Sequence, residues 1–349
     1  MLLDKIKKMA PVNIRLNPFG AVILTICIAC GIIYNFGLLN WFQKEERICM
    51  KELLSVSIEL ARRGGRKVLE VREKNALTAK VKGFTKEGAA ELKTLGDMES
   101  HRAILYGMAK AFPGLKVISE EHETKPVDFH NIEDTAKQRE DVNKEIKSDQ
   151  RIPLNQIVVW IDPLDATQEY TEDLRQYVTT MVCVAVNGDP TIGVIHSPFD
   201  DQTYWAWVSY GHSSNLKPLE KVQLSNEKPT QIIVSRSHPG KVVDVIKKAF
   251  GENTVVVEAG GAGYKALNVV KGLSNAYVHT TAIKKWDICA GNAILNALNG
   301  KMTTLNGDYI DYSSKDNVQN DKGLLATMQY HYHYLEHLEP LAKQLEKKT

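Results

Sequence analysis

This sequence lacks several features that would assign it to a protein class. Only five cysteines occur in 349 residues, and two of them, Cys27 and Cys30, lie in an apolar N-terminal stretch, so a framework of disulfide bonds is not expected. The net charge of +2 argues against a protein that binds nucleic acid through a broad basic face. There is no Asn-x-Ser/Thr glycosylation site and no C-terminal Lys-Asp-Glu-Leu retrieval signal, so neither can place the chain in a compartment.

Charged residues are also absent from one long apolar run near the N-terminus, at 19–39. Four basic residues precede this run, and the aromatic pair Trp41 and Phe42 follows it. A helix of this length would cover roughly the 30 Å of a bilayer core. A cleaved signal peptide or a buried core helix fits less well, since the run is long and lacks a small-x-small cleavage site. We therefore predict a cytosolic basic tail (1–18), a transmembrane anchor (19–39) and a lumenal domain (44–345), because flanking positive charge favours a cytosolic N-terminus.

The rest of the chain has the composition of a globular domain, with 43% hydrophobic and 25% charged residues. Apolar periodicity predicts helices at 44–73, 98–112, 241–250, 264–270 and 288–298, and strands at 115–119, 157–161, 178–186, 191–196, 204–208, 231–234, 254–257 and 276–279. Alternation of helices and strands in the second half indicates a layered α/β fold. We interpret the polar segment 122–155 as a surface insertion or flexible loop. Cys183 lies within a predicted buried strand, where core packing is its expected role.

The most informative motif follows the strand at 157–161. It reads Asp162-Pro163-Leu164-Asp165-Ala166-Thr167 and delivers two carboxylates at the C-terminal end of a buried strand, where α/β sheets commonly bind ligands. A helix that begins here would offer free backbone N–H groups to a phosphate. Mg²⁺ prefers carboxylate oxygens and commonly bridges to a substrate phosphate. The motif therefore predicts a magnesium and phosphate site, although Asp165 alone could be a simple helix cap.

Two further acidic residues support a functional site over isolated caps. Glu120, with Glu121 beside it, follows another predicted strand, and Asp287 opens a predicted helix. A single acidic residue at the end of an element is usually a solvated cap. Several at one sheet edge indicate a metal site.

Together these motifs resemble the inositol monophosphatase family. The resemblance rests on Thr94-Leu95-Gly96-Asp97, Glu120-Glu121, Asp162–Thr167 and Trp286-Asp287-Ile288-Cys289-Ala290-Gly291, which occur in the family's order over about 50–345. It implies an αβαβα sugar-phosphatase fold and a lithium-sensitive, Mg²⁺-dependent phosphomonoesterase. Ala166 replaces a glycine found in most of the family, so we expect no positive φ at this position.

The resemblance also implies roles for the acidic residues. Two to three Mg²⁺ ions would be held by Glu120, Asp162, the Leu164 carbonyl, Asp165 and Asp287. Asp97 and Thr167 would orient and deprotonate the attacking water, a role that sequence alone does not separate from plain helix capping by Asp97.

Within the family, the sequence most resembles the branch that removes the 3′-phosphate of 3′-phosphoadenosine 5′-phosphate (PAP). This implies a single-pass protein of the Golgi membrane that clears the product of lumenal sulfation. Ser235, His238, Gly261 and Lys265 would contact the adenosine 5′-phosphate, although the same residues could form an ordinary surface turn. Two alternatives remain at this stage: an inositol phosphate as substrate, and an inactive, anchored nucleotide-binding protein. The sequence predicts no nucleic-acid partner and leaves the oligomeric state open.

Overall fold

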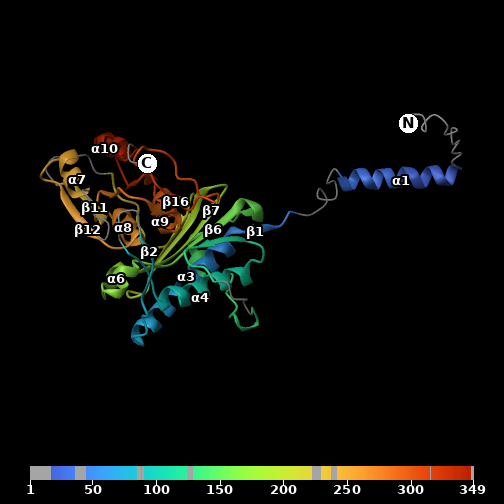
Figure 1. Ribbon diagram of the computed structural model, residues 1–349, viewed down its shortest axis with the longest axis horizontal. Coiled ribbons are helices and arrows are strands. Elements are labelled where there is room, and N and C mark those ends of the chain that lie inside the picture. Colours follow the sequence, from blue (N-terminus) through green and yellow to red (C-terminus); the bar gives the residue numbers. More distant parts are fainter. Residues whose placement is uncertain are drawn as a thin grey trace, which may run out of the picture. The chain divides into compact units, whose positions relative to one another are not determined.

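The computed structural model describes residues 17–35, 45–84, 88, 90–123, 129–221, 229–236, 242–314 and 316–346 (Figure 1). The chain divides into two compact units, Met1–Glu46 and Arg47–Thr349. Within the first, α1 spans Pro18–Asn35. Across the described ranges, no helix is long and apolar enough to cross a membrane. The predicted anchor at 19–39 is therefore not confirmed; its last four residues, like 1–16 of the predicted tail, lie outside the described residues.

The second unit is built on a six-stranded sheet. Its strand order is β10 (Gly211–His212), β9 (Gln202–Trp207), β8 (Asp189–Ser197), β7 (Thr179–Val186), β6 (Ile157–Asp165) and β4 (Lys116–Ser119). Only the β4–β6 pair is parallel; the other pairs are antiparallel. All nine residues of β6 are buried. A continuous apolar run, Ile157-Val158-Val159-Trp160-Ile161, is what a strand covered on both faces requires.

Helices cover both faces of this sheet. On one face, α3 (Met50–Glu73) and α4 (Leu95–Ala111) lie together and form a core with alternate residues of β6 and β7, such as Val159 and Val182 (Figure 1). On the other face, α8 (Ala262–Val270) and α9 (Lys285–Ala297) pack against Trp160 and Met181.

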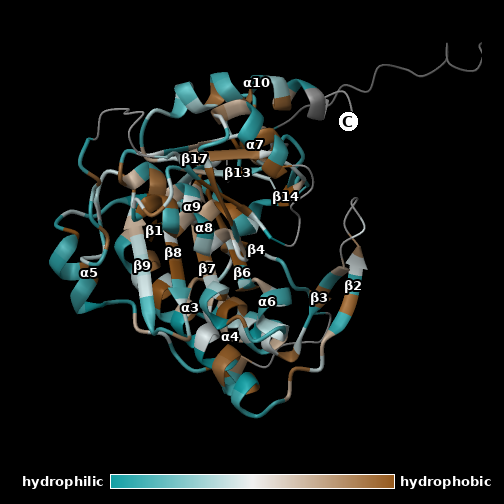
Figure 2. Ribbon diagram, turned by 90° about the vertical axis from the view of Figure 1, so that its left-hand side faces the viewer, coloured by the Kyte–Doolittle hydropathy of each residue, from teal (hydrophilic) through white to brown (hydrophobic). Residues whose placement is uncertain are grey.

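A second, five-stranded sheet lies on the far side of α8 and α9. Its order is β12 (Val255–Ala259), β11 (Gln231–Ser235), β13 (Ala276–His279), β17 (Leu324–Thr327) and β15 (Lys301–Thr303). Its outer face packs against α7 (Val242–Phe250) and α10 (His331–Glu346). The layers therefore run α, β, α, β, α, with apolar strands between the helices (Figure 2). The predicted layered α/β fold is confirmed.

Besides the pair of β1 (Arg47–Cys49) and β5 (Arg151–Pro153), two short antiparallel sheets complete the described part of this unit. The first joins β14 (Ile283–Lys284) to β16 (Gln319–Asn320). The second is a hairpin of β2 (Lys80–Phe84) and β3 (Ala90–Lys93), which pairs with no other described strand. A backbone hydrogen bond from Leu95 to Leu77 (3.0 Å) closes its base. Figure 2 shows the hairpin standing apart from the main sheets, on the side of the short helix α6 (Thr167–Thr171).

One predicted element boundary was wrong, and so was one of the two alternatives for 122–155, the flexible loop. The helix predicted at 44–73 begins only at Met50, because β1 (Arg47–Cys49) pairs with β5 (Arg151–Pro153) and Cys49 caps the helix. The described part of 122–155 is not a structureless loop. It holds the 3₁₀ turns η2 (Phe129–Asn131) and η3 (Leu154–Gln156), the helix α5 (Glu140–Glu145) and β5. Two fully buried side chains, Val142 and Ile146, fix this segment to the core.

Cys183 packs in the core, as predicted, but it also forms a bond that was not predicted. Cys183 in β7 and Cys289 in α9 form a disulfide bond, with their Cα atoms 5.7 Å apart. Both lie in the core between the six-stranded sheet and α9. Since 106 positions separate them in sequence, only the packing of α9 on β7 brings them together.

Candidate active site

The C-terminal end of β6 forms the floor of the candidate site. Asp162 and Asp165 flank a β-bulge in the pairing with β7, and the Leu164 N–H donates to Asp162 Oδ1 (3.1 Å). The chain then turns sharply into α6 through Ala166, whose φ is 68°. The expectation that this position needs no positive φ was wrong. The turn is required to lead the buried strand into the helix, and alanine adopts it in place of glycine.

Three carboxylates converge at this point. Glu120 follows β4, Asp162 lies in β6, and Asp287 lies in the first turn of α9, where it accepts from the Lys284 N–H (3.2 Å). One carboxylate oxygen of each lies within 4.8 Å of the others. Carboxylate oxygens at this spacing suit a hard cation such as Mg²⁺, so the residues present fit the metal that the sequence predicts.

The other predicted ligands lie close by but make different contacts. Asp165 Oδ2 accepts from the Gly263 N–H (2.8 Å) at the start of α8 and from Thr179 Oγ1 (3.3 Å). The Leu164 carbonyl accepts from Thr167 Oγ1 (3.1 Å). The closest group thus contains Glu120, Asp162 and Asp287, with Asp165 turned toward α8.

The electrostatics of the acidic group favour a bound cation. Burial, together with repulsion from neighbouring carboxylates, raises the pKa values of Asp162 and Asp287 well above the ordinary range. Burial likewise raises the pKa of Glu120 to about 7, although Lys82 opposes the shift. A divalent cation would offset the cost of ionising all three carboxylates.

Asp97 and Thr167, the predicted catalytic pair, are hydrogen-bonded to each other. Thr167 Oγ1 lies 3.1 Å from Asp97 Oδ1. Asp97 Oδ2 accepts from the backbone N–H of Thr94 (2.6 Å), and the Asp97 N–H donates to Thr94 Oγ1 (3.4 Å), which together form a capping box at the start of α4. Asp97 Oδ2 also accepts from the Thr94 hydroxyl (2.5 Å). Burial raises the pKa of Asp97 to about 6, while the Thr94 hydrogen bonds lower it. Asp97 is therefore both a helix cap and a buried carboxyl with an ionisation near neutral pH.

A cavity of about 580 Å³ joins the acidic group to the predicted substrate residues. Its lining includes the acidic residues Glu120, Asp165 and Asp287 and the predicted substrate contacts Ser235, Gly261 and Lys265. Lys265 is buried and donates to the Gly261 carbonyl (2.6 Å), and burial lowers the pKa of its ammonium to about 8. The predicted contact His238 lies outside the described residues.

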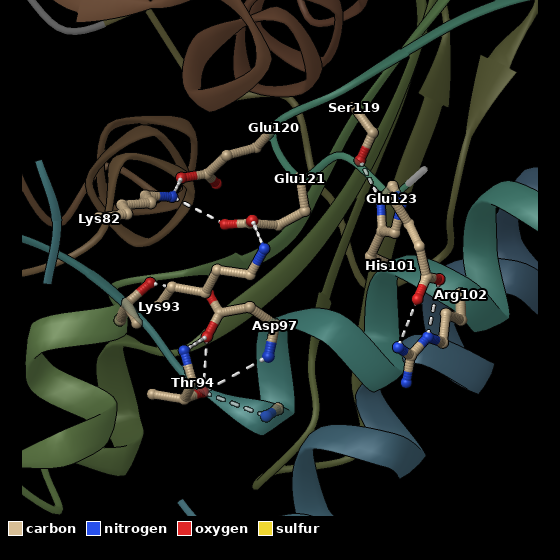
Figure 3. Close-up of polar contacts among 12 residues, drawn as sticks. Lys82, Lys93, Thr94, Asp97, His101, Arg102, Ser119, Glu120, Glu121 and Glu123 are labelled. Atoms are coloured by element: carbon tan, nitrogen blue, oxygen red, sulfur yellow. Dashed lines mark hydrogen bonds and ion pairs between the residues drawn. The ribbon is translucent and has the colours of Figure 1, made fainter. Parts of the chain in front are cut away.

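Sequence reasoning missed two lysines of the hairpin. Figure 3 shows Lys82 directed at Glu120 and Glu121, with Nζ to Oε1 distances of 2.5 and 2.8 Å. Lys93 Nζ lies 2.7 Å from the second oxygen of Glu121. Both occur in a polar, Lys-rich stretch that carries no motif. The one available signal was Gly88 between two short runs, which is typical of a hairpin.

The glutamates are also supported from the side of α4. Arg102 forms hydrogen bonds with both carboxylate oxygens of Glu123 (2.9 and 2.6 Å), and His101 Nδ1 lies 2.8 Å from Ser119 Oγ (Figure 3). These contacts fix the end of β4, from which Glu120 and Glu121 project.

A sequence model of the inositol monophosphatase family matches residues 50–346. The chain belongs to this family. The match spans every residue predicted above for the site, and it confirms the prediction that the chain is a metal-dependent phosphoric monoester hydrolase at the level of the family.

Individual relatives agree with this assignment. The chain is 47% identical to inositol monophosphatase 3 of Danio rerio, over 92% of this chain and 94% of the relative. It is 44% identical to the Golgi-resident adenosine 3′,5′-bisphosphate 3′-phosphatase of Mus musculus, over 94% and 97%. Among solved structures, inositol monophosphatase II from Staphylococcus aureus superposes with a TM-score of 0.61 at 18% identity, over 84% of this chain and 96% of the other. This structural similarity supports the family fold.

Proposed function

We propose that this protein removes the 3′-phosphate of 3′-phosphoadenosine 5′-phosphate (PAP), yielding AMP and phosphate. The observation that carries the proposal is the shared cavity, which is lined both by acidic residues of the site, Glu120, Asp165 and Asp287, and by the cationic Lys265. A substrate with two phosphates matches both groups: the metal site takes the phosphate that is cleaved, and Lys265 takes the one that is kept. The name of the Mus musculus relative supports the same substrate.

Each residue of the acidic site has a role in this proposal. Mg²⁺, as two to three ions held by Glu120, Asp162, the Leu164 carbonyl, Asp165 and Asp287, would activate water and polarise the phosphate. The Thr167 hydroxyl, hydrogen-bonded to Asp97, orients the attacking water. Asp97 accepts the proton that the attacking water loses. A carboxyl with a pKa of about 6 is largely ionised at neutral pH and is still basic enough to take up that proton.

The substrate end is built from the start of α8 and the end of β11. Gly261 has φ 65°, and a Cβ at this position would lie 2.6 Å from the Tyr177 carbonyl oxygen, so the turn at the start of α8 requires glycine. Ser235, Gly261, Lys265 and His238 together would hold the 5′-phosphate.

Phosphate release from a panel of substrates tests this proposal. The full-length chain with Mg²⁺ should hydrolyse PAP faster than inositol 1-phosphate or fructose 1,6-bisphosphate, and Asp162→Asn should abolish the activity. Preference for inositol 1-phosphate would instead support the alternative suggested by the name of the Danio rerio relative. Mg²⁺ binding without turnover of any substrate would support an inactive nucleotide-binding protein.

Lys265→Met provides the sharper test of the proposal that the substrate carries two phosphates and that Lys265 binds the one that is kept. Loss of a hydrogen bond to a charged group costs about 1.5–3 kcal/mol, so the preference for PAP over adenosine 3′-monophosphate should fall about 10- to 100-fold. Ser314→Ala, which alters a partly exposed polar residue that does not line the cavity, is the control. An unchanged preference would remove Lys265 from the 5′-phosphate site.

We also propose that the protein works in the Golgi lumen, held by an anchor at 19–39 with a cytosolic N-terminus. The charge-free run and the basic residues before it support this topology. Resistance to carbonate extraction, lost when 19–39 are deleted, would test the anchor.

Cells without the protein should show reduced glycosaminoglycan sulfation if PAP removal relieves inhibition of sulfotransferases. Millimolar lithium should inhibit the purified enzyme. Normal sulfation would contradict the cellular role, and insensitivity to lithium would count against the assigned metal site.

A further inference from the structure

The hairpin β2–β3 places a lysine on a carboxylate of the metal group. Lys82 Nζ lies 2.5 Å from Glu120 Oε1 and 2.8 Å from Glu121 Oε1 (Figure 3). Its side chain is 27% exposed, so the ammonium is accessible from the cavity that it helps to line. Glu120, a predicted metal ligand, is therefore already paired with a cation of the protein itself.

The neighbouring Glu121 has a different set of partners. One of its oxygens contacts Lys82 and the other contacts Lys93 (2.7 Å). Glu121 is not in the group of carboxylates that could hold a metal among the described residues. It can therefore keep both lysines when Glu120 changes its partner, so Lys82 has a place to remain without leaving the site.

The hairpin is built so that this exchange needs little rearrangement. Its two strands pair only with each other among the described strands, so a shift of β2 breaks no ladder of the main sheets. Lys82 needs to move only from a position shared between two carboxylates to one of them.

We propose that Lys82 competes with the metal ion for Glu120. An ammonium and a divalent cation on the same carboxylate repel each other, so occupancy by one lowers occupancy by the other. Lys82 thus sets the Mg²⁺ concentration at which the site fills, and it holds the acidic group together below that concentration. This inference rests on the metal site of the proposed function and is independent of the substrate.

Binding of Mn²⁺ alone to the full-length chain, followed by electron paramagnetic resonance of free Mn²⁺, tests the competition without turnover. Lys82→Met should tighten binding about two- to fivefold, the range expected for a partly exposed ion pair. Lys80→Met removes the same charge from an exposed position on the same strand and should leave the Kd within about 1.5-fold of wild type. Lys82→Arg keeps the charge and should bind Mn²⁺ no more tightly than wild type.

The results separate this inference from the proposed function. Unchanged or weaker Mn²⁺ binding by Lys82→Met would overturn it and would make Lys82 a support for the metal-bound site. Equally tighter Mn²⁺ binding by Lys82→Met and Lys80→Met would also overturn it, because the loss of any positive charge near the site would then explain the result. Absence of Mn²⁺ binding by the wild-type chain would overturn the metal site itself. A thermal melt in chelator checks that the variants fold. Lys82→Met should have a lower melting temperature than wild type without metal, and adding Mn²⁺ should raise its melting temperature by more than that of wild type.

Discussion

Ala166 holds a left-handed backbone conformation that costs an L-residue about 1–2 kcal/mol. Glycine would remove this cost but would gain conformational freedom in the unfolded chain. We therefore expect Ala166→Gly to stabilise the protein by about 0.5 kcal/mol, measured from the urea midpoint. Ala103→Gly, in the interior of α4, should destabilise it by about 0.5–1 kcal/mol. Destabilisation by both variants would show that the Ala166 methyl group packs favourably enough to outweigh the strain.

Asp97 serves two purposes that a pair of variants can separate. Asp97→Asn keeps a side-chain oxygen for the capping box but removes the proton acceptor, so kcat should fall about 10²- to 10⁴-fold with a small change in stability. Thr94→Ala removes the cap hydroxyl and should instead lower stability by about 1 kcal/mol.

The pH profile supplies the matching check on Asp97. Because the base must be ionised, wild-type activity should fall as pH drops through the pKa of about 6, and this acid limb should be lost in Asp97→Asn. Persistence of the same limb in the variant would assign the ionisation to another group.

At the scale of elements, the Cys183–Cys289 bond ties the strand β7 to the helix α9. It closes a loop of more than a hundred residues in the unfolded chain, and α9 also carries Asp287. The double variant Cys183→Ala/Cys289→Ala should lose about 2–4 kcal/mol of unfolding free energy. Equal urea midpoints for the wild-type chain with and without a reductant that breaks the bond would contradict this expectation.

Some features of these elements were predictable from the sequence, and others were not. The β6 strand and its two aspartates were predictable because a continuous apolar run and a turn motif are local signals. Acidic residues at the ends of β4 and α9 were predictable for the same reason. The disulfide bond, the Lys82 contact and the β1–β5 pairing each join residues far apart in sequence, and composition and periodicity carry no information on such pairs.

At the scale of the whole molecule, the buried acidic group makes stability depend on pH and on metal. The pKa of Glu120 is raised from 4.5 to about 7 in the folded chain. Between these values the unfolded chain releases a proton that the folded chain keeps, so the folded state binds more protons. Without metal, the contribution of Glu120 to stability should therefore be greatest at and below about pH 4.5, fall as pH rises to about 7, and change little above it.

Thermal unfolding in chelator at pH 5 and pH 8 tests this expectation, with the lower melting temperature expected at pH 8. Adding Mg²⁺ should reduce the difference between the melting temperatures at pH 5 and pH 8, because the cation binds the ionised carboxylates of the folded chain. Glu120→Gln should flatten the pH dependence, whereas Glu252→Gln, at an exposed turn, should not. A metal-free protein more stable at pH 8 than at pH 5 would contradict this expectation and would assign the pH dependence of stability to other groups.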